Sequence, residues 1–197
     1  MPFISFEGCD KSGKTTQAQI LFERLEKLRV PTISIRSPGG VVRSTGIDHL
    51  PLVIGEDLRA LSIKYYDTSA GPYLFMAGFV SMAPLIEWAC EKDIFVIADR
   101  WVDSCCVYQG NVRPLLNLAC LPMPTTTFLL IGQKGSFEED DFHVQADVKN
   151  KEREDAFRRL STIDPFRWIE VSNHEKTWNH VQQRYFPGGE KEKYVYP

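Results

Sequence analysis

Apolar residues along this chain occur in two patterns, which predict two kinds of element. Short continuous apolar runs at Phe3–Glu7, Ile94–Ala98 and Thr126–Ile131 are typical of strands that are covered on both faces. From Lys14 to Arg29 the apolar residues instead recur at steps of three and four, which predicts a helix with one buried face. The chain therefore opens with a buried strand, a glycine-containing break at Gly8–Gly13 and a helix.

The central part of the chain continues this alternation. Thr32–Arg36 alternates like a strand, and the following stretch, 37–46, is predicted to be a loop because it contains Pro38, Gly39 and Gly40. A second helix is predicted over about Tyr73–Cys90. Pro84 should bend or interrupt that helix, because proline lacks an amide hydrogen and its ring clashes with the preceding turn.

The last third is more polar. Lys149–Leu160 reads as a charged helix with a thin apolar side, Phe166–Val171 as a last strand and Glu175–Tyr185 as a closing helix, with a frayed tail over about 187–197. Strands that alternate with helices predict an α/β fold, a parallel sheet with helices on both faces. The 197 residues form one predicted domain, because the chain is too short for two ordinary ones.

Composition narrows the possible partners. A formal net charge of −3 and a pI near 5.8 argue against a general nucleic-acid binder, so any anionic ligand must be held by local groups. The N-terminal MPFISFEG carries no basic segment followed by a long apolar run, and we expect a soluble, cytoplasmic protein without a membrane span. The five cysteines lack zinc-site spacing and are expected to be reduced thiols.

The segment from Gly8 to Thr15 matches the phosphate-loop pattern G-x-x-x-x-G-K-[ST], and it lies between a predicted strand and a predicted helix. In such a loop the glycines let backbone amides point at phosphate oxygens, Lys14 reaches the β and γ phosphates, and the Thr15 hydroxyl binds Mg²⁺. ATP and Mg²⁺ are the expected cofactors. The loop alone leaves GTPases, motor ATPases and small-molecule kinases open.

Three segments resemble the thymidylate kinase family. FISFEGCDKSGKTTQ (Phe3–Gln17) is similar to its opening segment, and VIADRWVDSCCVYQG (Val96–Gly110) is similar to its strand ending in Asp-Arg-aromatic followed by Tyr-Gln-Gly. YLFMA (Tyr73–Ala77) is similar to its Leu-Phe-x-Ala helix. The resemblance covers roughly residues 1–131 and implies the three-layer P-loop NTPase sandwich and a kinase that transfers the γ-phosphoryl group of ATP to thymidylate.

The resemblance also implies roles for particular residues. Arg100 would hold the acceptor phosphate, Asp99 would order Mg²⁺ together with Thr15, and Phe75 would stack on the base. Tyr108 and Gln109 would contact the base and sugar, and Asp10 would face the 3′-hydroxyl. The residues implied to bind the nucleotide are Gly8, Asp10, Ser12, Gly13, Lys14, Thr15 and Thr16. Asp99 and Arg100 directly follow an apolar strand, at the edge where open α/β sheets bind ligands.

The stretch Ile35–Gly46 (IRSPGGVVRSTG) permits two alignments with the family. Its first half resembles a bacterial Arg-Glu-Pro-Gly-Gly segment, with Ser37 in place of the glutamate. Its second half resembles the Arg-Ser-Thr of the eukaryotic and poxvirus type. Either Arg36 or Arg43 is a candidate contact for the acceptor phosphate, and we prefer Arg43.

Two departures affect the function. Family members carry an arginine four residues after the stacking phenylalanine, and here that position is Phe79. The expected lid, about 134–147, contains the acidic run Glu138–Asp141, so we expect Lys11 of the phosphate loop, rather than a lid arginine, to stabilise the transition state. That arrangement is the one of the eukaryotic and poxvirus type, which suggests a viral or eukaryotic source; a viral protein would work in host cytosol or nucleus.

The favoured hypothesis is a thymidylate kinase in which Lys14, Lys11, Arg100 and Asp99 act on the transferred group. Two alternatives stay open. One is a deoxynucleoside kinase or a monophosphate kinase for another base, and the other is a degenerate nucleotide-binding protein with little turnover. The resemblance further implies a homodimer.

Overall fold

The computed structural model describes residues 2–50, 56–109, 121–131 and 141–187. Within them a six-stranded sheet has the order β3-β2-β4-β1-β5-β6. All neighbouring strands are parallel except β2 and β3, which form an antiparallel pair. The strands are β1 (Phe3–Gly8), β2 (Thr32–Arg36), β3 (Val41–Thr45), β4 (Phe95–Asp99), β5 (Thr126–Leu130) and β6 (Trp168–Val171).

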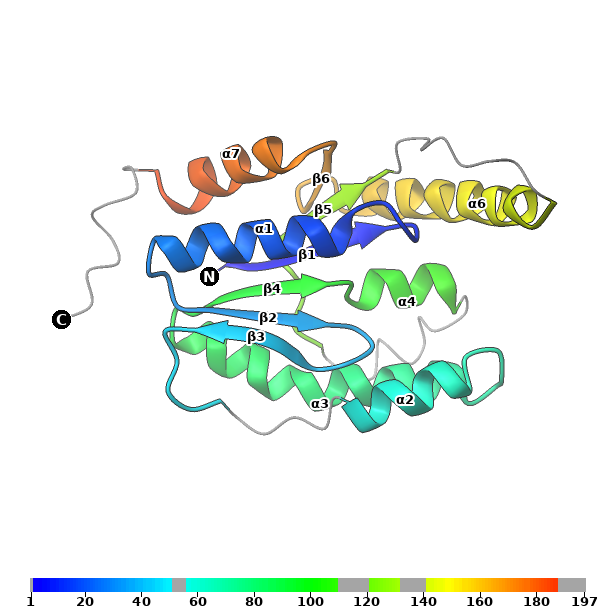
Figure 1. Ribbon diagram of the computed structural model, residues 1–197, viewed down its shortest axis with the longest axis horizontal. Coiled ribbons are helices and arrows are strands. Elements are labelled where there is room, and N and C mark those ends of the chain that lie inside the picture. The colour runs from blue at the N-terminus through cyan, green and yellow to red at the C-terminus, as the bar shows by residue number, and fades with distance from the viewer. Residues whose placement is uncertain (1, 51–55, 110–120, 132–140, 188–197) are drawn as a thin grey trace.

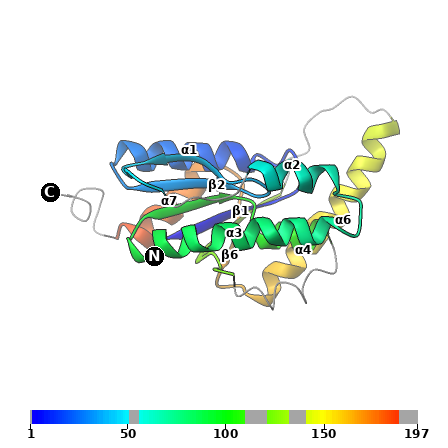
Figure 2. The ribbon, with the colours of Figure 1, turned by 90° about the horizontal axis from the view of Figure 1, so that it is seen from below.

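Helices cover both faces of the sheet (Figure 1). They are α1 (Lys14–Lys27), α2 (Glu56–Lys64), α3 (Gly71–Glu91), α4 (Val102–Tyr108), α6 (Asp141–Ile163) and α7 (His174–Tyr185). Helices α1 and α7 pack on one face, and α3 packs on the other with α2 beside it. Helix α6 extends beyond the end of the sheet to which the parallel strands point (Figures 1 and 2).

The alternation of side chains along β1 divides the core into two layers. Ile4 and Phe6 pack with the apolar face of α1, whereas Phe3 packs with α3. This is the period-two pattern of a strand that is buried on both faces. Ser5 and Glu7 lie on the same side as Phe3, so this side of β1 becomes polar toward the carboxyl end of the strand.

Most of the predicted elements are confirmed, and the prediction of a loop over 37–46 is wrong. The predicted loop 37–46 contains β3, which pairs with the edge of β2. Pro84 does not interrupt helix α3, which runs from Gly71 to Glu91, since the proline lies on the exposed side while apolar packing holds the opposite side. A bend at Pro84 stays a prediction. Helices α2 and α4 were not predicted.

Helix α3 is also long and apolar enough to cross a membrane by length and composition alone, and it is the one such helix in the described part of the chain. Core helices of globular proteins pass the same test. Met82, Leu85 and Ile86 of α3 are fully buried against the sheet, as in a core helix. The predicted lid reaches the described residues only where α6 begins at Asp141, and all of the predicted tail after residue 187 lies outside them.

Candidate active site

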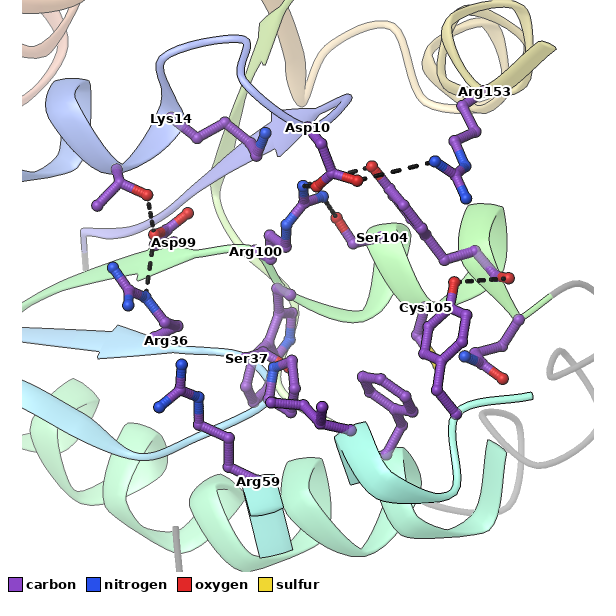
Figure 3. Close-up of a pocket in the computed structure, with 18 of the residues that line it drawn as sticks. Asp10, Lys14, Arg36, Ser37, Arg59, Asp99, Arg100, Ser104, Cys105 and Arg153 are labelled. Carbon is purple, nitrogen blue, oxygen red and sulfur yellow. Dashed lines mark hydrogen bonds and ion pairs between the residues drawn. The ribbon is translucent and has the colours of Figure 1, made fainter. Parts of the chain in front are cut away.

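A cavity of about 750 Å³ lies at the carboxyl ends of β1, β2 and β4 (Figure 3). Its walls come from the phosphate loop, the segment after β2, α2, α3, α4 and α6. One end is polar and lined by the loop from Asp10 to Thr16, and the other is lined by aromatic side chains that include Phe75 and Phe79. A ligand with a charged end and a flat apolar end would fit this division.

The phosphate loop forms the polar end. Gly8 has φ +138°, and a Cβ at this position would lie 2.1 Å from the carbonyl oxygen of Leu130. Only glycine therefore fits where the end of β1 lies against β5. Lys14 is buried, and its Nζ donates to the carbonyl of Cys9 and to Ser12 Oγ, the latter at 3.1 Å. Burial lowers the pKa of Lys14 to about 8. The negative charge of nearby phosphate oxygens would raise this pKa again.

Asp99 ends β4 beside the phosphate loop. Its Oδ2 accepts from Thr15 Oγ1 at 2.7 Å and from Arg36 Nε at 3.3 Å. A hydroxyl and a carboxylate side by side are hard oxygen ligands of the kind that Mg²⁺ prefers. No cluster of three or more His, Cys, Asp or Glu side chains suited to a metal occurs among the described residues. Thr15 and Asp99 therefore suit an ion that substrate phosphates and water also hold.

Arg100 joins the two ends of the cavity. Its backbone has φ +71°, which is rare outside glycine and turns the side chain back over the phosphate loop. The guanidinium donates to Gly8 O at 2.9 Å, Ser104 Oγ at 3.0 Å, Asp10 Oδ1 at 2.6 Å and Tyr108 Oη at 3.4 Å. A single planar cation therefore contacts both the loop and α4 (Figure 3).

Aromatic rings build the other end. Phe75 is half-buried, and its ring meets Tyr66 edge to face at a centroid distance of 6.1 Å. Phe79, one turn later on α3, is fully buried and meets Trp101 at 5.0 Å. The half-buried ring of Phe75 is thus available to a base in the cavity, whereas Phe79 is part of the supporting wall.

Comparison with known proteins agrees with this geometry. The sequence profile of the family described as thymidylate kinase matches residues 6–182. The chain belongs to the thymidylate kinase family. The thymidylate kinase of Nitrobacter winogradskyi is 32% identical over 191 residues, covering 86% of this chain and 80% of the relative. That of Afipia carboxidovorans is 28% identical over 211 residues, covering 92% and 89%.

A solved thymidylate kinase structure from Ehrlichia chaffeensis shares the fold, with a TM-score of 0.70 at 24% identity over 92% of this chain and 98% of that one. The predicted P-loop kinase fold and the predicted family are confirmed. Both relatives named above are bacterial, and the closer likeness to the eukaryotic and poxvirus type stays a prediction.

Arg43, the arginine preferred from sequence, lies away from the cavity of this family member. It is on strand β3, where its guanidinium pairs with Glu26 of α1 at 2.9 Å and lies 4.7 Å from the ring centroid of Phe22. The reason is the unexpected strand: alternation along β3 turns Arg43 toward α1. Arg36, the alternative, lines the cavity.

Two arginines that the sequence argument missed also line the cavity. Arg59 comes from α2 and points toward Arg36 and Ser37 in Figure 3, and a Cβ on Gly39 would lie 3.5 Å from its Cδ. Arg153 comes from α6, lies 3.7 Å from Asp10 Oδ2 and stacks 4.3 Å from the ring centroid of Tyr108. The charged pattern of the helix containing Arg153 was visible in the sequence, but nothing local identified which of its basic residues faces the loop.

The other candidate residues are brought together as expected. Lys11, Thr15 and Thr16 line the cavity, and so do Tyr108 and Gln109. The Nε2 of Gln109 is buried and finds no hydrogen-bond partner within the described ranges. A buried amide without a partner is costly, so this group is suited to a ligand acceptor atom.

Proposed function

We propose that this chain transfers the γ-phosphoryl group of ATP to thymidylate, giving ADP and thymidine diphosphate. The observation that carries the proposal is the continuous cavity from Lys14 to Phe75 with Arg100 at its centre. Such a cavity can hold a triphosphate and a nucleoside monophosphate end to end. Membership of the thymidylate kinase family and the names of its relatives support the same choice of acceptor.

The donor end would hold ATP through the phosphate loop. The amides from Asp10 to Thr16 and the N-terminus of α1 attract phosphate oxygens, and Lys14 supplies a buried cation. Gly8, Ser12 and Gly13 give the loop its curvature and its contacts. Thr15 and Asp99 would hold Mg²⁺, which when bound neutralises charge on the β and γ phosphates.

The acceptor end would hold the monophosphate by charge and the base by stacking. Arg36, Arg59 and Arg100 come from different elements and line one cavity, where planar guanidinium groups suit a phosphate. Phe75 would stack on the thymine ring. Tyr108, Gln109 and Asp10 would contact sugar and base, with Asp10 already fixed by two arginines.

Transfer needs positioning and positive charge more than proton chemistry. The acceptor phosphate is already anionic near neutral pH, so no strong general base is required and no covalent intermediate is proposed. Lys14, Lys11 and Arg100 would stabilise the charge that spreads over the moving group in an in-line displacement. Arg153 reaches the loop from α6 and is a fourth candidate, beyond the residues expected from sequence.

The residue at position 79 supports a second candidate function, in which the acceptor is not thymidylate. The family arginine is replaced by a buried aromatic residue, so an acceptor other than thymidylate, such as another monophosphate or a nucleoside, is the second candidate. ADP formation measured with ATP, Mg²⁺ and each deoxynucleoside monophosphate or thymidine in turn tests the choice, with Lys14→Ala as control. Preference for thymidylate supports the proposal, preference for another acceptor supports the rival, and nucleotide binding without transfer indicates a degenerate binding protein.

The family resemblance also leads us to propose a homodimer in the cytoplasm, without nucleic acid or membrane partners. The apolar side chains of Leu61 on α2 and of Tyr73 and Val80 on α3 are 41%, 63% and 50% exposed. Exposed apolar side chains on two helices that pack together could be buried against a second copy of the chain. Light scattering on the purified protein would give twice the chain mass if this is right, and the single-chain mass if it is wrong.

A further inference from the structure

A buried acid lies directly beneath Arg100 and has no part in the mechanism above. Glu7, near the end of β1, is 0% exposed. Both of its oxygens accept hydrogen bonds: Oε1 accepts from the backbone amide of Trp101 at 2.7 Å, and Oε2 accepts from the hydroxyl of Ser104. Both donors follow Arg100 closely in the chain: Trp101 is the next residue, and Ser104 lies in the first turn of α4.

The Trp101 contact restrains the backbone of Arg100. Arg100 has φ +71°, a conformation that costs free energy in a residue with a Cβ and persists only where its surroundings hold it. The Arg100 amide donates to Phe6 O at 3.1 Å, and the Trp101 amide donates to Glu7. Two successive amides around the unusual residue are therefore anchored to successive residues of β1.

The Ser104 contact directs the side chain of Arg100. A serine hydroxyl has one proton and can accept with its lone pairs. Because the Ser104 proton is given to Glu7, a lone pair of Ser104 accepts from Arg100 Nη1, at 3.0 Å. The ionised carboxylate of Glu7 can receive both donors, whereas a glutamine at position 7, like the protonated acid, would have only one oxygen that accepts readily.

The position is costly for a carboxyl group. Burial, reinforced by the neighbouring charge of Asp103, raises the pKa of Glu7 to about 8. Asp103 is itself paired with Arg167 through two contacts, at 2.7 and 3.1 Å, so that cation is engaged elsewhere. The other titratable or charged groups near Glu7 are Arg100, Lys14 and the Cys105 thiol. A residue kept where it weakens the fold is typical of a functional constraint.

We propose that Glu7 is a positioning residue for the acceptor phosphate, holding the backbone of Arg100 through the Trp101 amide and its guanidinium through the Ser104 hydroxyl. This inference rests on the proposed function, in which Arg100 binds that phosphate. Glu7 does not touch the substrate. Its effect on catalysis passes through Arg100 and is therefore specific to the acceptor end of the cavity.

Steady-state kinetics of Glu7→Gln, Ser104→Ala and the double variant test the inference, measured at pH 9, above the pKa of Glu7, where its carboxylate is ionised. Each single variant should raise KM for thymidylate about tenfold, the loss expected when a charge-assisted hydrogen bond is misplaced, with KM for ATP unchanged. The double variant should raise KM for thymidylate no more than the more impaired single variant does, because both changes break one chain of contacts. Ser5→Ala is the matched control: Ser5 is buried on the same side of β1, bonds to Thr127 at 3.0 Å and should leave both KM values unchanged.

Two failures are distinguishable. If the wild-type protein neither binds nor phosphorylates thymidylate, the proposed function is wrong and the inference falls with it. If the wild-type protein is active and Glu7→Gln leaves KM for thymidylate unchanged, or changes both KM values equally, the inference alone is overturned. Thermal melts establish that each variant is folded. If Glu7→Gln does not fold, Glu7→Asp, whose carboxylate reaches less far, is measured in its place and should likewise raise KM for thymidylate alone.

Discussion

The donor and acceptor ends of the cavity are built in opposite ways. The donor end is one contiguous segment, Gly8 to Thr16, whose function depends mainly on backbone shape. The acceptor end takes Arg36 from the end of β2, Arg59 from α2, Phe75 from α3 and Arg100 from the end of β4. The difference shows why a short motif identifies the nucleotide but not the acceptor: the first depends on local geometry, the second on how distant elements pack.

The largest expected effect is at the donor end. Lys14→Ala removes the buried cation that reaches the β and γ phosphates, and kcat should fall by about 10²–10³-fold or more, the range for removing one transition-state donor. The fold should survive, because the loop is held by its glycines and by β1. Stopped-time assays of ADP formation measure the loss. Activity within a few-fold of wild type would mean that the donor site has been misplaced.

The next prediction tests whether a residue that lines the acceptor end of the cavity, Phe79, also stabilises the fold. Phe79→Ala removes a fully buried ring that packs on Trp101, and it should destabilise the fold by about 3–5 kcal/mol. Glu87→Ala on the exposed side of α3 should change stability by no more than about 0.5 kcal/mol. Urea unfolding of both variants gives the comparison. A small effect at Phe79 would show that the wall can rearrange, as a site for a different acceptor would require.

A third prediction separates the arginines. Arg59→Ala should raise KM for thymidylate about tenfold or more while leaving KM for ATP unchanged, since it removes one charge-assisted phosphate contact. Arg43→Ala is the matched control, because Arg43 pairs with Glu26 and lies outside the cavity. Initial rates over a thymidylate series measure both. A larger effect at Arg43 than at Arg59 would restore the preference drawn from sequence.

The last prediction concerns pH and stability, and it leaves the kinetics of either end aside. Glu7 has a raised native pKa, so between its ordinary value of 4.5 and about 8 the folded protein binds a proton that the unfolded chain has released. The contribution of Glu7 to stability therefore declines as pH rises through that interval. The melting temperature of Glu7→Gln, measured relative to wild type, should rise from pH 5 to pH 8. A constant difference would show that Glu7 does not titrate in this range.

Elements could be predicted from the sequence wherever neighbouring residues alone determine the structure. The apolar runs at β1, β4 and β5 are buried strands, and the phosphate loop lies between β1 and α1 as the motif requires. The sequence was insufficient at β3, which is an exposed edge strand with little apolar pattern, and at α2, whose polar and apolar residues give a weak stripe. Both elements are defined by the neighbours on which they pack.

The preference for Arg43, which does not line the cavity, followed directly from those two omissions. With 37–46 taken as a loop, both Arg36 and Arg43 were candidates and Arg43 was preferred, and with α2 unseen, Arg59 was not considered. A single strand of alternating side chains decides the matter, because it directs Arg43 toward Phe22. Roles for the residues at the acceptor end thus required the topology, whereas roles at the donor end did not.

The central claim is direct transfer between the two ends of one cavity. The measurement that tests it most directly uses ATP carrying oxygen-18 on the γ-phosphoryl group, incubated with thymidylate and Mg²⁺, with the products identified by mass spectrometry. The account predicts that the label appears in the terminal phosphate of thymidine diphosphate and that this product forms at least about 10²-fold more slowly with Lys14→Ala. Label found only in inorganic phosphate, or in another acceptor supplied in competition, would contradict it.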